Sequence, residues 1–147
     1  MQRMDLAEHA PEAIQTLLQL SKQVRAGIEP RLHHLVDLRA SMINGCAYCV
    51  DMHSREGIED GDTAQRLFAV AAWRESTLFT ERERTALELT DALTRLGEGG
   101  VSDELWERAR SHFTDKELAH LVLAIGVINV WNRNAISVHK ETPLAAH

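Results

Sequence analysis

Apolar residues recur along most of this chain every three or four positions, a spacing that places them on one face of a helix. One such segment begins at Pro11 and can end at Gly27, and a second begins at Pro30 and meets the pair Asn44-Gly45. Proline suits the first turn of a helix, and glycine suits the position just after its last turn. These two segments are therefore predicted to be helices.

Shorter apolar patterns continue the helical prediction beyond Gly45. We expect a third helix from about Cys46 to about Gly57, and a fourth that follows Asp62 as its N-cap. The residues that the fourth helix is predicted to bury are Leu67, Phe68 and Ala71. No segment in this region alternates in the way that a half-buried strand requires.

Two later helix starts carry the capping-box pattern, in which a Thr oxygen and a Glu side chain satisfy backbone N–H groups reciprocally. The pairs are Thr80 with Glu83 and Thr114 with Glu117. A short helix between them is expected to begin at Ser102, after a glycine-rich loop.

The last helical segment, residues 118–132, is apolar almost all round. Such a helix is buried on every side in a soluble protein, so we expect it to be central or to form a subunit interface. Its unbroken apolar stretch, Leu121 to Ile128, is far below the roughly 20 residues that cross a bilayer, so no membrane association is expected. With no strand pattern, repeat or linker, the chain is predicted to be all-α, an oligomeric single-domain bundle of about six to seven helices over residues 1–147.

Composition and charge narrow the function. Of the 147 residues, 44% are hydrophobic and only 5% aromatic, which favours helices. A formal net charge of −6 at pH 7, with no Lys/Arg cluster, argues against nucleic-acid binding. The N-terminal residues lack the pattern of a signal peptide, so we expect a cytoplasmic protein. In that reducing compartment a C-x-x-C pair is more often redox-active or metal-binding than a structural disulfide.

Cys46, Cys49 and His53 share one stripe of the third predicted helix, at positions i, i+3 and i+7. Residues three apart on a helix have Cβ atoms about 5–6 Å apart, close enough for the cysteines to cycle between dithiol and disulfide. Only a thiolate attacks a peroxide or a disulfide, and an unperturbed thiol with a pKa of about 8.5 is mostly protonated at neutral pH. His53 can accept the thiol proton.

Two physical arguments disagree on which cysteine becomes the thiolate. The helix dipole favours Cys46, which is nearer the helix N-terminus. Proximity to His53 favours Cys49, because Cys46 is seven residues away, roughly 10 Å along the helix axis. Two further interpretations stay open: a pair of inert buried thiols, and a zinc site completed by His33 or His34.

Residues 32–53, LHHLVDLRASMINGCAYCVDMH, resemble the core motif of the alkylhydroperoxidase D and carboxymuconolactone decarboxylase superfamily. A looser match continues from Phe79 and again from Ile128, so the resemblance covers most of the chain. It implies an all-helical homo-oligomer, a trimer or hexamer, that reduces hydroperoxides and is recycled by a disulfide-reducing protein donor. We expect no cofactor and no resident metal.

The same resemblance implies roles for the motif residues. Cys49 would be peroxidatic and form a sulfenic acid, Cys46 would resolve it to a disulfide, and His53 would relay protons. The family often has a glutamate twelve residues before the first cysteine, where this chain has His34. An imidazole also carries protons near pH 7, so His34 is either a relay residue in place of that glutamate or a solvated surface residue. Glu83 could be an acidic relay residue, but its capping box already explains it.

Two other functions remain compatible with the sequence besides a thiol-dependent alkyl hydroperoxide reductase. One is a lactone enzyme like carboxymuconolactone decarboxylase, although true decarboxylases generally lack the cysteine pair. The other is a non-catalytic helical module that binds zinc, or that binds a partner through its apolar last helix.

Overall fold

The structure is a computed structural model that describes residues 1–145, and within this range the chain forms helices and no strands. The elements in chain order are α1 (Leu6–His9), α2 (Pro11–Ala26), α3 (Pro30–Asn44), α4 (Ala47–Glu59), α5 (Ala64–Ala69), the 3₁₀ helix η1 (Val70–Ala72), α6 (Glu81–Arg95), α7 (Asp103–His112) and α8 (Asp115–Ser137). The chain is a single helical domain, which confirms the predicted fold class. The seven α-helices from α2 to α8 correspond to the predicted helices, and only the short α1 was not predicted.

Most helix ends lie where local sequence signals predicted them. Pro11 and Pro30 stand in the first turns of α2 and α3. Gly45 ends α3 with a φ of 70°, a left-handed conformation that glycine adopts without steric cost. Both capping boxes form, at the starts of α6 and α8, and the Ser102 side chain accepts the Leu105 N–H at the start of α7.

The start of α5 differs from the prediction by one residue. Its N-cap is Thr63, whose hydroxyl oxygen accepts the Arg66 N–H. Asp62 has another role, because its carboxylate accepts the Thr63 N–H at 2.8 Å and the Arg66 Nε–H at 2.8 Å. The prediction places the N-cap one residue too early, because the Asp62 carboxylate is also a strong hydrogen-bond acceptor.

The predicted burial in this helix was right for one residue of three. Leu67 is 1% exposed, but Phe68 is 75% exposed and Ala71 is also exposed. The helix has only six residues and continues as the tighter η1, so the α-helical period does not extend to Ala71. The buried residues that follow are Val70 and Trp73.

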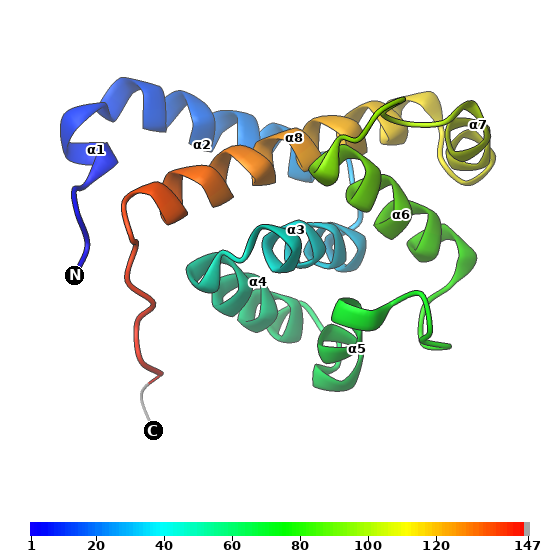
Figure 1. Ribbon diagram of the computed structural model, residues 1–147, viewed down its shortest axis with the longest axis horizontal. Helices are drawn as coiled ribbons and strands as arrows, with labels where there is room; N and C mark the ends of the chain where they lie inside the picture. Colours follow the sequence, from blue (N-terminus) through cyan, green and yellow to red (C-terminus); the bar gives the residue numbers. More distant parts are fainter. Residues whose placement is uncertain (146–147) are drawn as a thin grey trace.

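Helix α3 lies at the centre of the molecule, with α2 and α8 on one side and α4 and α5 on the other (Figure 1). Its apolar residues join two core clusters, one shared with α6 and α8 and one shared with α5 and η1. Every residue from Leu32 to Leu38 is buried, including the titratable His33, His34 and Asp37. Because burying such groups without partners is costly, this helix needs polar contacts from its neighbours.

Helix α8 corrects the expectation of burial on every side. Leu121 and Ile125 are buried, whereas Leu123 is 52% and Val130 is 43% exposed. The other elements of the chain cover only one side of α8, and the two exposed residues are seven positions apart, so they share its uncovered face. The predicted oligomer, which would cover that face, stays a prediction. No helix in residues 1–145 is long and apolar enough to span a membrane.

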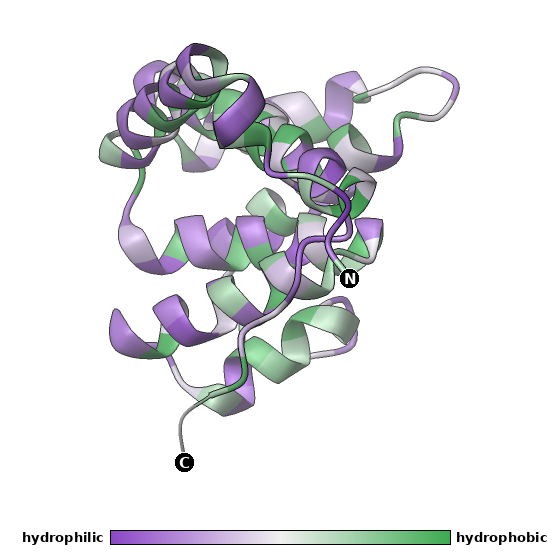
Figure 2. Ribbon diagram, turned by 90° about the vertical axis from the view of Figure 1, so that its left-hand side faces the viewer, coloured by the Kyte–Doolittle hydropathy of each residue, from purple (hydrophilic) through white to green (hydrophobic). Residues whose placement is uncertain are grey.

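The N-terminal residues lie beside the segment that follows α8 (Figure 2). The Arg3 N–H donates to the Val138 carbonyl at 2.8 Å. The Lys140 ammonium lies 4.2 Å from the centre of the Tyr48 ring, in the first turn of α4. The segment that follows α8 therefore passes close to the start of α4, which carries the cysteine pair, and the N-terminal residues bond to that segment.

Candidate active site

The two cysteines lie at the start of α4 and are joined by a disulfide bond. Gly45 turns the chain after α3, so that Cys46 becomes the N-cap of α4 and its sulfur accepts the Cys49 N–H at 3.3 Å. Their Cα atoms are 5.3 Å apart, a usual separation for a disulfide. Each residue is only 2% exposed.

Cys49 borders a cavity of about 500 Å³, whereas Cys46 is not among the residues that line it. The walls are mostly apolar and come largely from α2 and α8. Their apolar side chains include Ile14, Leu18, Val24, Val127, Ile128 and Trp131. A small molecule with an apolar body could therefore approach the sulfur of Cys49 through this cavity.

His53 follows Cys49 by one turn of α4, is 1% exposed and borders the same cavity. Its Nε2 is 3.6 Å from Asp37 Oδ2, and its Nδ1 is 3.5 Å from Glu56 Oε2. These distances are long for hydrogen bonds, so the two carboxyl groups act on the imidazole mainly through charge. The structure thus brings Cys49 and His53 to one cavity and adds two carboxyl groups beside them.

The two carboxyl groups have opposite pKa shifts. Burial raises the pKa of Asp37 to about 6, although the nearby His53 and Arg25 act to lower it. The contact with His53 lowers the pKa of Glu56, and this effect outweighs that of its partial burial. Glu56 is therefore the firmly ionised partner of His53 at neutral pH, whereas Asp37 exchanges a proton just below neutral pH.

His33 is a second buried imidazole beside Asp37. Its Nε2 is 3.1 Å from Asp37 Oδ2. Burial lowers the pKa of His33 to about 2, and the positive charge of Arg25 adds to the shift. His33 is thus a neutral side chain in contact with a carboxyl group, and the pair is not an ion pair at neutral pH.

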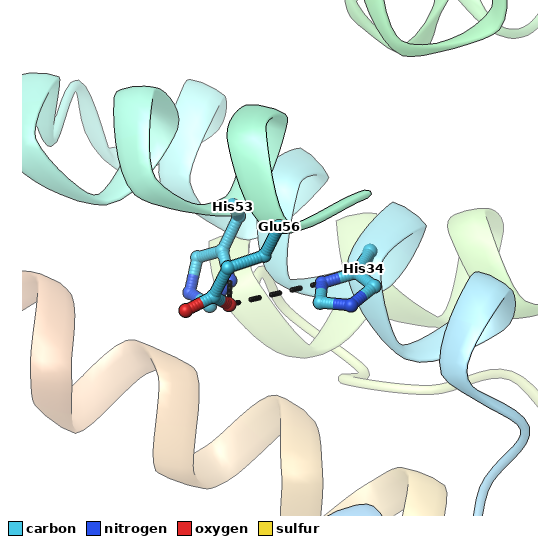
Figure 3. A group of neighbouring side chains, drawn as sticks. All are labelled: His34, His53 and Glu56. Carbon is cyan, nitrogen blue, oxygen red and sulfur yellow. Dashed lines mark ion pairs between the residues drawn. The ribbon is translucent and has the colours of Figure 1, made fainter. Parts of the chain in front are cut away.

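His34 is 3% exposed, so the interpretation of this residue as a solvated surface histidine is wrong. Its Nε2 is 2.6 Å from Asp60 Oδ2, and its Nδ1 is 4.0 Å from Glu56 Oε2. Figure 3 shows the Glu56 carboxylate beside the His53 ring and facing His34. His34 is not among the residues that line the cavity, and Glu56, which does line it, lies between the two helices that carry the histidines.

Three charged residues around His53 were not predicted from the sequence, namely Arg25, Asp37 and Glu56. Glu56 follows His53 by three residues and continues the stripe of the two cysteines, a signal that could have identified it. Asp37 follows His34 by three residues on the preceding helix. Arg25 comes from α2, and its Nη2 is 3.8 Å from Asp37 Oδ2 and 3.7 Å from Glu56 Oε2. No local pattern connects this arginine with the cysteine motif.

Glu83 has the structural role that its capping box predicted. Its carboxylate accepts the Thr80 N–H at 2.8 Å and also pairs with Arg66 at 2.5 Å. It does not line the cavity beside Cys49.

Comparison with known proteins places this site in a family. Residues 9–92, more than half of the chain, match the model of the Carboxymuconolactone decarboxylase family. The chain is also 36% identical over 138 residues to the uncharacterised protein YdfG of Bacillus subtilis (strain 168). That alignment covers 93% of this chain and 94% of the Bacillus protein, so the likeness extends far beyond the cysteine motif.

Solved structures show the same fold. ATU0492 of Agrobacterium tumefaciens, a protein of unknown function described as a candidate antioxidant defence protein AhpD, has a TM-score of 0.94 and 42% identity. The comparison covers 99% of this chain and 100% of that one. The debrominase Bmp8, solved with 2,3,4-tribromopyrrole, has a TM-score of 0.81 and 16% identity over 92% of this chain and 73% of its own. This fold therefore hosts more than one chemistry, and function has to be argued from the site.

Proposed function

The chain belongs to the carboxymuconolactone decarboxylase family, and we propose that it is a thiol-dependent alkyl hydroperoxide reductase. The observation that carries the proposal is the position of Cys49, which is half of a C-x-x-C disulfide and borders the cavity together with His53. A dithiol beside a proton-accepting imidazole can deliver two electrons to a small oxidant. The description of ATU0492, which is 42% identical, supports the same class of activity.

The first step oxidises Cys49. Its thiolate attacks the terminal oxygen of R–O–OH, so that a sulfur–oxygen bond forms and the oxygen–oxygen bond breaks. Cys49 becomes a sulfenic acid, and the alkoxide takes up a proton and leaves as the alcohol. In this scheme His53 accepts the thiol proton and returns it to the departing oxygen, while the charge of Glu56 stabilises the imidazolium.

The second step forms the disulfide. The Cys46 thiolate attacks the sulfenic sulfur of Cys49, and the oxygen leaves as water after it takes up a proton. A dithiol donor then reduces the disulfide by exchange, and the donor becomes a disulfide itself. The Cys46–Cys49 bond in the structure corresponds to the oxidised state of this cycle.

In this order of steps, the helix dipole and the proximity of His53 act on different cysteines. The cavity and His53 favour Cys49 as the cysteine that meets the peroxide. The helix N-terminus favours a thiolate at Cys46, whose sulfur already accepts a first-turn N–H. A resolving cysteine also has to be a thiolate when it attacks, so the dipole would assist the second step.

We further propose that His34 takes the place of the family's glutamate in passing protons to solvent. His53 Nδ1 and His34 Nδ1 both lie near the same carboxylate oxygen, Glu56 Oε2, at 3.5 and 4.0 Å. The other nitrogen of His34 is 2.6 Å from Asp60, whose side chain is 50% exposed. Small movements of these side chains would complete a route from the buried His53 to water.

The test is a titration of the reduced protein with cumene hydroperoxide and, separately, with hydrogen peroxide. Thiols are counted and masses are followed in the wild type, Cys46→Ser and Cys49→Ser. We expect the wild type to lose both thiols, and Cys46→Ser to accumulate a sulfenic acid at Cys49 that dimedone traps. Because the cavity walls are mostly apolar, cumene hydroperoxide should react faster than hydrogen peroxide.

Full peroxide consumption by Cys49→Ser with unchanged folding would contradict the assignment of Cys49. Thiols that stay reduced in excess peroxide would exclude the peroxidase as a whole. The lactone alternative would then be tested directly, by turnover of carboxymuconolactone in the variant with both Cys46→Ala and Cys49→Ala.

A further inference from the structure

The geometry points to a binding site for a divalent transition-metal ion, such as Zn²⁺, formed by His34, His53 and Glu56. One potential ligand atom of each residue lies within 4.8 Å of the other two. The carboxylate oxygen Oε2 of Glu56 is 3.5 Å from His53 Nδ1 and 4.0 Å from His34 Nδ1. Figure 3 shows the three side chains converging between α3 and α4.

The three ligand atoms are buried and lack hydrogen-bond partners. His34 Nδ1, His53 Nδ1 and Glu56 Oε2 make no hydrogen bond within the described part of the chain. The side chains of His34 and His53 are only 4% and 2% exposed. A buried polar atom without a partner is costly, and three that converge on one point indicate a shared partner. A metal ion would satisfy all three lone pairs at once.

The opposite nitrogens of both imidazoles face carboxyl groups. His34 Nε2 is 2.6 Å from Asp60 Oδ2, and His53 Nε2 is 3.6 Å from Asp37 Oδ2. Metal-binding histidines in proteins usually direct their second nitrogen to a carboxylate or carbonyl in this way. A proton on each Nε2 leaves the lone pair on Nδ1, which is the nitrogen that faces Glu56.

The ligand types also suit such an ion. Two imidazoles and one carboxylate are a common ligand set of zinc sites and of non-haem iron sites that keep open positions. Metal–ligand bonds of about 2.0–2.2 Å would require the three atoms to move only modestly closer together. Arg25 now lies 3.7 Å from Glu56 Oε2, but its side chain is 40% exposed and can turn towards solvent.

This site differs from the zinc site considered from the sequence, which would use both cysteines. The disulfide removes those thiolates, whereas the trio of two histidines and Glu56 stays available in the oxidised protein. The inference also departs from the expectation of no resident metal. If the proposed peroxidase is correct, a metal on His53 and Glu56 would exclude their part in proton transfer, so metal binding would inhibit the thiol cycle.

The test is a Zn²⁺ titration of the disulfide form by calorimetry, with any affinity tag removed, and a parallel Co²⁺ titration followed by absorption. We expect one ion per chain. Both His34→Ala and Glu56→Gln should weaken binding by about tenfold or more and change the Co²⁺ spectrum. Arg25→Gln should tighten binding, because it removes a competing positive charge.

His33→Gln is the matched control, since His33 is as buried as His34 but lies outside the trio. It should bind Zn²⁺ as the wild type does. Glu56→Gln keeps the test valid if His34→Ala fails to fold, because the Glu56 side chain is 33% exposed. Equal affinity in the wild type and Glu56→Gln would overturn the proposal. The readout is metal binding by the oxidised protein, so it does not depend on peroxide turnover.

Discussion

Asp37 and Asp91 are both buried carboxylates, but within residues 1–145 only Asp91 has a guanidinium at hydrogen-bond distance. It accepts two N–H groups of Arg39 at 2.6 and 3.2 Å and the indole N–H of Trp73 at 3.3 Å. Asp37 lies 3.8 Å from Arg25, and its 3.1 Å contact is with the neutral His33. Its Oδ1 has no hydrogen-bond partner among the described residues. Burial raises the pKa of Asp37 to about 6, because a carboxylate shielded from water and without a close cation favours its protonated form.

A pH-dependent stability change should follow from Asp37. Its folded-state pKa of about 6 lies above the ordinary value of 3.8, so between these values the folded chain binds more protons than the unfolded chain. The free energy of unfolding attributable to Asp37 therefore falls as pH rises through this window. Asp37→Asn should raise the free energy of unfolding at about pH 8 by on the order of 1 kcal/mol, and change it little at about pH 4. Urea denaturation at both pH values measures this.

Asp91→Asn is the control for the loss of a buried carboxylate. It would leave Arg39 without its charged partner, so it should lower the free energy of unfolding by about 3 kcal/mol at neutral pH. A loss of stability in Asp37→Asn that is equal at both pH values would show that burial of the Asp37 charge is not the cost inferred here.

At the scale of the helices, Gly45 and Gly126 separate the effect of backbone conformation from that of packing. A Cβ added at either position would meet no atom within 4 Å. Gly45 has a φ of 70° at the junction of α3 and α4, whereas Gly126 lies in the interior of α8. Gly45→Ala should destabilise the protein by about 1–2 kcal/mol, and Gly126→Ala should stabilise it by about 0.5–1 kcal/mol. The free energies of unfolding in urea measure both.

The opposite signs are the informative result. If Gly45→Ala were neutral, the left-handed turn would not be what positions Cys46 at the start of α4. If Gly126→Ala were destabilising in the purified protein, a close contact of this glycine with a second subunit would account for the cost.

Helix ends could be predicted from the sequence because their causes are local. A capping box such as Thr80 with Glu83 acts within four residues, and a proline restricts its own φ. The errors concern α5 and α8, where burial depends on other parts of the molecule. Phe68 and Leu123 are exposed because no other part of residues 1–145 covers them, which their helical spacing does not reveal.

In the candidate site, too, local features could be predicted from the sequence and contacts between helices could not. The i, i+3, i+7 spacing was enough to predict that the cysteines and His53 share one helix. Cys46 is the N-cap of α4, and the other two residues lie within it. Asp37 and Arg25 come from α3 and α2, so their approach to His53 and Glu56 depends on how three helices pack. Sequence spacing contains no direct information about that packing, and the pKa shifts that result from it could not be predicted.

At the scale of the whole molecule, the uncovered face of α8 bears on assembly. Leu123 and Val130 expose about half of their surface on this face, at 52% and 43%. We expect this face to lie in a subunit interface, as the predicted trimer or hexamer requires. Leu123→Glu should therefore reduce the mass in solution towards that of one chain, 16.5 kDa, in size-exclusion chromatography with light scattering.

Gln65→Glu adds negative charge to an exposed position of α5, away from the uncovered face of α8, without removing apolar surface. It should keep the assembly of the wild type. A wild-type protein that is already a monomer, or a Leu123→Glu variant that assembles fully, would exclude this face from a subunit interface.

The burial of the disulfide also has a kinetic consequence for its reduction. A donor thiolate must approach a sulfur nearly in line with the S–S bond, but Cys46 and Cys49 are each 2% exposed in the chain. The donor would then have to wait for a local opening of the chain near the start of α4, where Lys140 packs on Tyr48. At high donor concentration the rate of disulfide reduction should level off at the rate of this local opening. Turnover would then be limited by the opening of the chain and not by the reactivity of the donor thiol.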